Sequence, residues 1–337
     1  MPHRHVSRVV LPVLCSLFIV AARAGDDGLV IGTYRTVTVV DGDTFKIEGL
    51  GRSIRFLCID TEETPKRGDV PALVEELRHQ WPGIYTRERG ESAFPIKHDS
   101  PFGYETAVWA KKWFAEADSV RLERDVASQV YDYYGRYLAY IIAFKKGRAV
   151  NFNVECVRLG YSPYSVKYGP STRFNDAFVA AQKEAQAARR GIWNAKSACY
   201  PDYTERLAWW GQRGAAIGEF DLRYAHDPRY FFLGRDGEYE RLALASSQTV
   251  VAFGALGAIR QARFPYLVEL MHKNKLSCNM VFFETMQPLF AAIPWSTFAQ
   301  RFVYVRGKVK VYDGKPELVI ESAKDISMTP IVLAKTR

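Results

Sequence analysis

The sequence predicts an α+β protein in which a small barrel with three helices is followed by a second, strand-rich domain. The chain has 337 residues and is 48% hydrophobic, which is enough for two domains. Between residues 30 and 200, runs with a two-residue alternation of apolar side chains are interspersed with helical patterns. From residue 201 the composition shifts and a second set of strand patterns begins. We therefore expect one domain at 30–200 and another at 201–337.

Residues 1–24 have the pattern of a secretory signal peptide. A basic start precedes an apolar run at 9–21, and Ala22-Arg23-Ala24 forms an A-x-A cleavage site. The run is too short to span a bilayer comfortably. We expect a secreted or periplasmic protein with no stable membrane insertion after cleavage. Cleavage removes three arginines and no acidic residue, so the formal charge falls from +9 to about +6, which suits a polyanion such as nucleic acid.

Two β-patterned runs, 36–48 and 53–60, bring acidic and basic side chains together. The first is interrupted by the motif DGDT at 41–44, which predicts a bulge or sharp bend at the glycine. The second contains Arg55, which is costly to bury unless it is paired with an anion. It ends in the motif DTEET at 60–64. Each piece alone is also typical of a common turn or a solvated loop.

The remaining elements of the first domain follow an insertion at about 66–100. Helical periodicity and closing glycines predict three helices, and alternation predicts two strands. The helices are expected at 104–117, 151–159 and 173–190, and the strands at 120–124 and 136–144.

The four motifs, in their order, resemble the staphylococcal nuclease family. They are DGDT at 41–44, the Arg-led strand ending in DTEET at 55–64, YGRYLAY at 134–140, and GIW at 191–193. The resemblance covers about residues 33–195 and identifies the small barrel as a five-stranded OB-type barrel. It implies a calcium-dependent phosphodiesterase that hydrolyses DNA and/or RNA.

The resemblance also implies a role for each matched residue. By the resemblance, the calcium ligands are Asp43, Asp60 and the Thr61 carbonyl. Glu63 is the base or water-positioning group, and Tyr134 is a substrate-binding residue. The arginines on the scissile phosphate are Arg55 and Arg136. Elementary chemistry agrees, because a hard cation prefers oxygen ligands, a guanidinium fork binds phosphate oxygens, and a carboxylate can act on the attacking water.

The sequence departs from the family at several positions. Glu62 stands where members usually have proline, so the turn is expected to be looser. Val166 aligns with a tyrosine that some members use against the nucleotide, which leaves Tyr164 or Tyr168 as substitutes. The insertion at 66–100 is expected to change substrate access.

The second domain is predicted to be an OB-like domain. Strands are expected at 264–271, 279–283, 302–312 and 317–321, with a turn at 313–315, and residues 305–326 resemble the closing hairpin of bacterial OB-fold nucleic-acid-binding domains. Several lysines lie among aromatic residues here, and they fit either a nucleic-acid groove or solvated edge positions that block strand pairing. They are Lys273, Lys275, Lys308, Lys310 and Lys315.

The four cysteines outside the predicted signal have no zinc-site spacing. Cys58 and Cys156 are expected to be packed thiols, and Cys199 and Cys278 could form a bridge between the domains in an oxidising compartment.

The main alternative to an enzyme is a catalytically silent nuclease-like module that binds nucleic acid or protein. A scaffold of two barrels is a third possibility. The complete set of arginines and carboxylates favours the enzyme.

Overall fold

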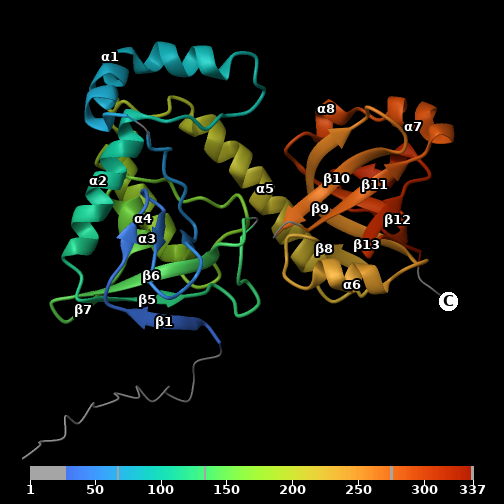
Figure 1. Cartoon of the computed structure of the whole chain (residues 1–337), viewed down its shortest axis with the longest axis horizontal. Helices are drawn as coiled ribbons and strands as arrows, with labels where there is room; N and C mark the ends of the chain where they lie inside the picture. The colour runs from blue at the N-terminus through green and yellow to red at the C-terminus, as the bar shows by residue number, and fades with distance from the viewer. Residues whose placement is uncertain (1–27, 67, 133, 274–275, 335–337) are drawn as a thin grey trace, which may run out of the picture.

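The structure, a computed structural model, describes residues 28–334 except 67, 133, 274 and 275. The predicted signal peptide lies outside the described residues. Figure 1 shows two β-rich units joined by the long helix α5 (Tyr203–Tyr224). None of the helices in the described part of the chain is both long and apolar enough to cross a membrane.

The first unit is built on a closed five-stranded barrel, as predicted. Strands pair in the order β1-β5-β6-β4-β3-β2, with β1 and β2 as successive parts of the strand that closes the ring. All of these pairs are antiparallel except β4 with β6. The strands are β1 (Val30–Tyr34), β2 (Thr38–Val39), β3 (Thr44–Lys46), β4 (Ile54–Phe56), β5 (Ser119–Glu123) and β6 (Tyr137–Lys145), with β7 (Arg148–Asn151) added beside β6.

The DGDT motif forms the tight turn of a hairpin between two strands, where the sequence predicted a bulge or sharp bend within one strand. Val39 on β2 pairs with Phe45 on β3, and the Val40 amide donates to the Thr44 carbonyl at 2.9 Å. Gly42 is required here because a Cβ would lie 2.5 Å from Cγ2 of Thr106 and 2.8 Å from Oγ1 of Thr61. The turn is therefore pressed against the neighbouring helix and loop, and its aspartates are fixed in place.

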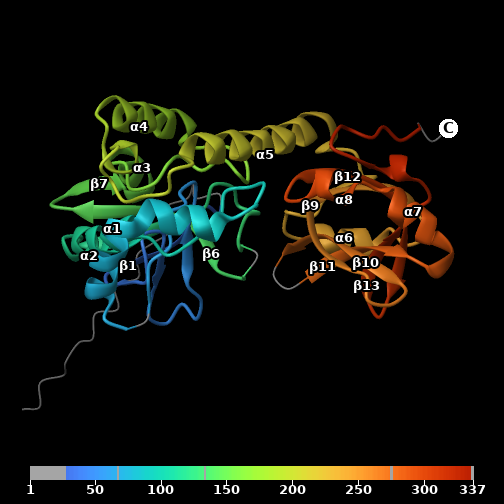
Figure 2. The ribbon, with the colours of Figure 1, turned by 90° about the horizontal axis from the view of Figure 1, so that it is seen from above.

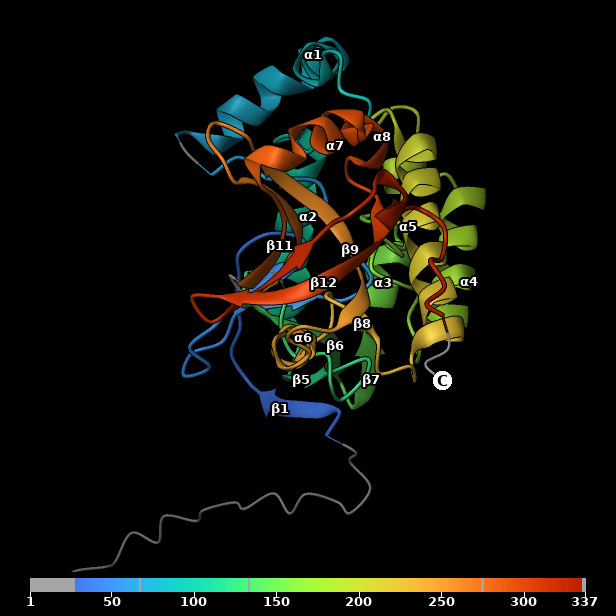
Figure 3. The same cartoon turned by 90° about the vertical axis from the view of Figure 1, so that its right-hand side faces the viewer.

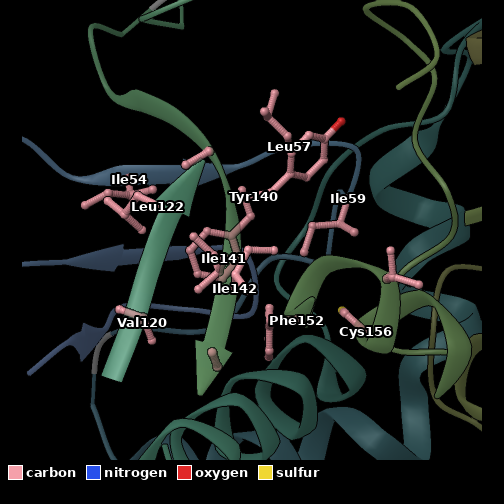
Figure 4. Close-up of a cluster of buried hydrophobic side chains, with 14 of the residues drawn as sticks. Ile54, Leu57, Ile59, Val120, Leu122, Tyr140, Ile141, Ile142, Phe152 and Cys156 are labelled. Atoms are coloured by element: carbon pink, nitrogen blue, oxygen red, sulfur yellow. The ribbon is translucent and has the colours of Figure 1, made fainter. Parts of the chain in front are cut away.

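The three predicted helices are present, and the insertion contains a fourth. The predicted ones are α2 (Pro101–Ala115), α3 (Phe152–Arg158) and α4 (Asn175–Ala187), and the additional one is α1 (Val70–Arg89). Figure 4 shows how the barrel strands and α3 share one apolar core. Phe56, Phe114 and Phe152 meet there at ring-centroid distances of 4.5–6.2 Å. This packing fixes the helices against the barrel.

An aromatic cluster joins α1 to the start of α5. It consists of Trp81, Tyr85, Phe102, Ile192, Tyr200 and Tyr203. The indole N–H of Trp81 donates to the Cys199 carbonyl at 2.7 Å, and Tyr85 donates to Asp202 Oδ2 at 2.6 Å. The insertion is therefore an integral part of the first unit.

The second unit contains another closed barrel of the same strand order. Strand β9 pairs with both β10 and β12, and β11 and β13 are parallel, as β4 and β6 are in the first barrel. The strands are β9 (Thr249–Arg260), β10 (Tyr266–Lys273), β11 (Leu276–Phe282), β12 (Phe302–Tyr312) and β13 (Lys315–Val319), with β8 (Tyr230–Phe232) and β14 (Ile326–Ser327) outside the ring. The short helices α6 (Glu238–Leu244), α7 (Gln287–Ala292) and α8 (Trp295–Phe298) accompany them.

The lysines of the second unit are only partly described. Lys308 and Lys310 are exposed on β12, and Nζ of Lys310 lies 5.3 Å from the ring centroid of Phe283. Lys275 and the side chain of Lys273 lie outside the described residues. Both interpretations of these lysines stay open.

Contacts between the units run along α5, which is seen from above in Figure 2. The Arg213 guanidinium donates to the Gln300 carbonyl and lies 4.6 Å from the ring centroid of Phe302. The Val130 amide, in the loop before β6, donates to Asp236 Oδ2 at 2.9 Å. Figure 3, a view from the side of the second unit, shows α5 running beside its barrel.

All four described cysteines are free. Cys278 is fully buried in the second barrel, whereas Cys199 lies against the aromatic cluster of the first unit. The bridge between Cys199 and Cys278 that the sequence allowed is therefore not formed. Cys156 is fully buried, as expected for a packed thiol.

Candidate active site

The site is centred on an arginine held between two aspartates at one end of the first barrel. Register pairs Arg55 on β4 with Thr44 on β3, which puts the guanidinium beside the hairpin turn. It forms ion pairs with both Asp43 and Asp60, and the Asp60 side chain is only 2% exposed. A carboxylate so deeply buried needs such pairing to remain charged.

Asp43 is fixed by neighbouring donors as well. Its Oδ2 accepts from the Thr61 amide at 2.9 Å and from the Thr61 hydroxyl at 3.1 Å, and its Oδ1 accepts from the Thr44 hydroxyl at 3.1 Å. The DGDT turn and the loop after β4 are thereby locked together. The structure thus gathers Asp43, Asp60 and Thr61, the three residues to which the sequence assigned the metal.

Arg136 approaches the same turn from the loop before β6. Asp132 orients it: its Oδ2 accepts from the guanidinium Nε and Nη2, each at 2.7 Å, and its Oδ1 accepts from the Arg136 amide at 2.8 Å. The other end of the guanidinium, Nη1, donates to the Thr44 hydroxyl at 3.4 Å. Tyr134, in the same turn, is 72% exposed, and its ring centroid lies 5.4 Å from the Arg136 guanidinium carbon. Both arginines therefore converge on the Asp43–Thr44 turn.

Two lysines that the sequence analysis did not select complete the site. Lys97 Nζ lies 3.1 Å from Asp60 Oδ1 and 3.0 Å from Glu63 Oε1, and Lys167 Nζ lies 2.8 Å from Asp60 Oδ2. Burial would raise the pKa of Asp60, but Lys167, Lys97 and Arg55 lower it well below its usual range. Lys97 lies in the insertion, and Lys167 lies between the candidate tyrosines Tyr164 and Tyr168, so neither position carried a motif signal.

The loop that carries Thr61 and Glu63 is anchored by the buried Glu62. Its carboxylate accepts from the Tyr200 amide at 2.6 Å, from the Tyr203 hydroxyl at 2.8 Å and from the Ser100 hydroxyl. Burial raises the pKa of Glu62 to about 7, and these hydrogen bonds oppose the rise. The expected looser turn is thus replaced by a turn held through side-chain hydrogen bonds.

Helix α2 approaches the same loop closely enough to require a glycine. A Cβ on Gly103 would lie 2.0 Å from the Glu63 carbonyl oxygen. The Ser100 amide donates to that carbonyl at 3.0 Å, and the Thr64 hydroxyl donates to the Gly103 carbonyl at 2.9 Å. Glu63 is therefore held at the rim by backbone contacts on both sides, while its side chain is 36% exposed.

The structure decides between the two candidate tyrosines. Tyr164 is 5% exposed and its ring stacks on Phe178 with centroids 4.7 Å apart, so it cannot reach a substrate. Tyr168 is 60% exposed, and its ring centroid lies 5.3 Å from Lys167 Nζ. Only Tyr168 of the pair is available beside the site.

Comparison with known proteins agrees with this geometry. The family model described as "Staphylococcal nuclease homologue" matches residues 53–195. The uncharacterized protein MJ1439 of Methanocaldococcus jannaschii is 32% identical over 162 residues, which cover 48% of this chain and 70% of the relative. The chain belongs to the staphylococcal nuclease family. Its similarity to the thermonuclease of Staphylococcus hyicus is 27% identity over 164 residues, covering 48% of this chain and 76% of that protein. An uncharacterized Bacillus anthracis protein is 24% identical over 164 residues, covering 48% of this chain and 61% of the relative.

The donor chemistry of the family site suits a hard cation, but its arrangement here is crowded by protein cations. Asp43 and Asp60 are close enough to share one guanidinium, and two carboxylates with substrate oxygens and water are a common way to hold such an ion. Across residues 28–334, the described positions contain no group of three His, Cys, Asp or Glu side chains that could hold a metal. A cation at this position would take two carboxylates, Asp43 and Asp60, from the protein, and further ligands from backbone carbonyls, substrate or water.

Proposed function

We propose that this protein is a nuclease that hydrolyses phosphodiester bonds of DNA and/or RNA with a calcium ion in its site. The observation that carries the proposal is the convergence of Arg55 and Arg136 on the Asp43–Thr44 turn, with Glu63 on the adjoining loop. Two guanidinium groups in one partly buried site are suited to a phosphate whose charge increases in the transition state.

The division of labour follows from the contacts of each side chain. Arg136 is already oriented by Asp132 and Thr44, and the second N–H of its Nη1 can donate to a phosphate oxygen. Arg55 lies deeper, with its guanidinium between the two aspartates. Glu63 is at the exposed rim, where its carboxylate can accept a proton from, or orient, the attacking water.

The metal would be held by Asp43, Asp60 and the Thr61 carbonyl. A calcium ion bound there would neutralise phosphate charge and favour ionisation of the attacking water. The chain's own residues bind the phosphate and orient the water.

A hollow beside the acidic loop offers a route for substrate. It has a volume of about 230 Å³ and is lined by Thr64, Pro65, Lys66, Leu73 and Asp99. Leu73 belongs to α1, so the insertion forms one wall of this approach. The exposed rings of Tyr134 and Tyr168 are suited to stacking on bases, which favours unpaired strands.

The test is cleavage of single- and double-stranded DNA and RNA by the purified protein, with Ca²⁺ or with chelator. Arg136→Ala is the inactive comparison, and Arg121→Lys, on the far strand β5 where Arg121 pairs with Glu123, is the matched control. Cleavage by wild type and Arg121→Lys, lost in Arg136→Ala, supports the proposal. Binding of nucleic acid without cleavage in any of the proteins would favour the silent module instead.

Two further proposals accompany this function. Export is proposed from the signal-like pattern of residues 1–24. Protein recovered outside the cytoplasm should begin at Gly25 when its N-terminus is sequenced, and retention of residues 1–24 would contradict export.

A nucleic-acid groove on the second barrel is proposed from the exposed Lys308 and Lys310. Replacing both with Gln should weaken binding of long substrates at low salt and lessen the salt dependence. Unchanged binding at low salt would assign them to solvated edge positions.

A further inference from the structure

The acidic centre of the site is balanced by the protein's own cations. Three carboxylates and three basic side chains make up this cluster: Asp43, Asp60 and Glu63 with Arg55, Lys97 and Lys167. Burying charges is tolerated only when they are paired, and here each carboxylate has at least one cation within ion-pair distance. Charge balance therefore needs no additional ion, and an incoming cation must compete with groups already present.

Asp60 is the carboxylate for which the competition is strongest. Its Oδ1 faces Arg55 and Lys97, and its Oδ2 faces Lys167 at 2.8 Å. These three cations occupy both oxygens that a metal would use. A divalent ion can therefore reach Asp60 only if one of them withdraws.

Lys97 is the cation able to withdraw. Its side chain is 44% exposed, compared with 18% for Lys167 and 11% for Arg55. Lys167 Nζ lies 5.5 Å from the ring centroid of Trp210. Lys97, by contrast, lies on the loop leading into α2, and its side chain approaches Asp60 from the solvent-exposed side of the site. Its four-carbon side chain can turn towards water at little cost.

We propose that Lys97 is a built-in competitor for the divalent cation, whose ammonium group must leave Asp60 and Glu63 before the metal can bind. The proposal rests on the cation site of the proposed function. It makes metal occupancy depend on displacement of a lysine, so the site should bind calcium weakly for its number of carboxylates. Released Lys97 would remain beside the phosphate as an additional positive charge.

The first test is calcium binding to the substrate-free protein, measured by titration calorimetry. Lys97→Met and Lys97→Gln should each bind Ca²⁺ about tenfold more tightly or better, because a like charge within ion-pair distance of the shared carboxylate is removed. Lys97→Arg keeps the charge and should bind as weakly as wild type. Lys145→Met is the matched control, because Lys145 pairs with Glu116 at 3.3 Å and makes no ion pair with Asp60; it should change affinity less than threefold.

The second test follows Lys97 directly in the wild-type protein. Acetylation by a limiting reagent, read out by mass spectrometry, should modify Lys97 several times faster with Ca²⁺ than with chelator, while the rate at Lys145 is unchanged. Equal or weaker calcium binding by both neutral variants, or protection of Lys97 by calcium, would overturn the proposal. Absence of calcium binding in every protein would also overturn it. Nucleic-acid cleavage in chelator would then show whether the nuclease function survives without the ion.

Discussion

Replacing Glu62 with Gln should make the first unit less sensitive to pH. The Glu62 carboxyl is buried, and its pKa in the folded protein rises from 4.5 to about 7 because of that burial. An acid whose folded-state pKa is raised stabilises the fold fully below its unfolded pKa, and this contribution is lost as the pH rises through the folded pKa. The shift corresponds to about 3 kcal/mol in the free energy of unfolding.

The side chain introduced by Glu62→Gln would keep an acceptor for the Tyr200 amide and the Tyr203 hydroxyl without ever becoming charged. The measurement is urea unfolding followed by tryptophan fluorescence at about pH 5 and about pH 8. Relative to wild type, Glu62→Gln should gain up to about 3 kcal/mol between the two conditions. The exposed Glu48→Gln variant is the control and should show no such change. A wild-type-to-Glu62→Gln difference that is equal at both pH values would refute the reasoning.

Three other predictions concern the site and its support. Arg136→Lys should lower turnover by about 10² or more, since a point charge cannot reproduce the guanidinium fork; single-turnover cleavage measures it, and near-native rates would remove Arg136 from the assignment. Asp43→Ala should recover part of its activity at high Ca²⁺, whereas Glu63→Ala should not, because only the first variant weakens metal binding. The cleavage rate of each variant is measured against Ca²⁺ concentration. Equal recovery of the two variants would contradict the different roles given to Asp43 and Glu63. Gly103→Ala should lower the free energy of unfolding by about 3 kcal/mol, because its Cβ would clash with the Glu63 carbonyl. Gly218→Ala on α5 is the control, since a Cβ there meets open space. Thermal unfolding compares the two variants, and equal unfolding midpoints would show that α2 can shift to accept the methyl group.

Local pattern was sufficient for most of the first barrel and for the site residues on it. Arg55 was recognisable because a charged residue in a β core run needs an anionic partner, and both partners are now seen. Alternation and closing glycines placed β5, β6 and the three predicted helices to within a few residues, whereas the run 36–48 forms two strands and neither β1 nor β9 was predicted. The strand 302–312 of the second barrel has the bounds predicted for it.

What sequence reasoning missed depends on contacts between distant segments. Helix α1 was not predicted; its apolar side chains find their partners only when Trp81 and Tyr85 meet Tyr200. Lys97 and Lys167 have no local signal because their partner, Asp60, lies more than thirty residues away along the chain. Glu62 was noted only as a departure from proline, since its acceptor role requires Tyr203, which follows every nuclease motif.

The anchoring of Glu62 has a consequence for the order of assembly during synthesis. The barrel strands and all matched site residues emerge from the ribosome before Tyr200 and Tyr203 do. Until those two residues arrive, Glu62 lacks two of its three hydrogen-bond donors, and the loop bearing Glu63 lacks its support. A nascent chain can therefore close its first barrel while the loop bearing Glu63 is still unfixed, and the start of α5 would complete the site as a late, C-terminal step.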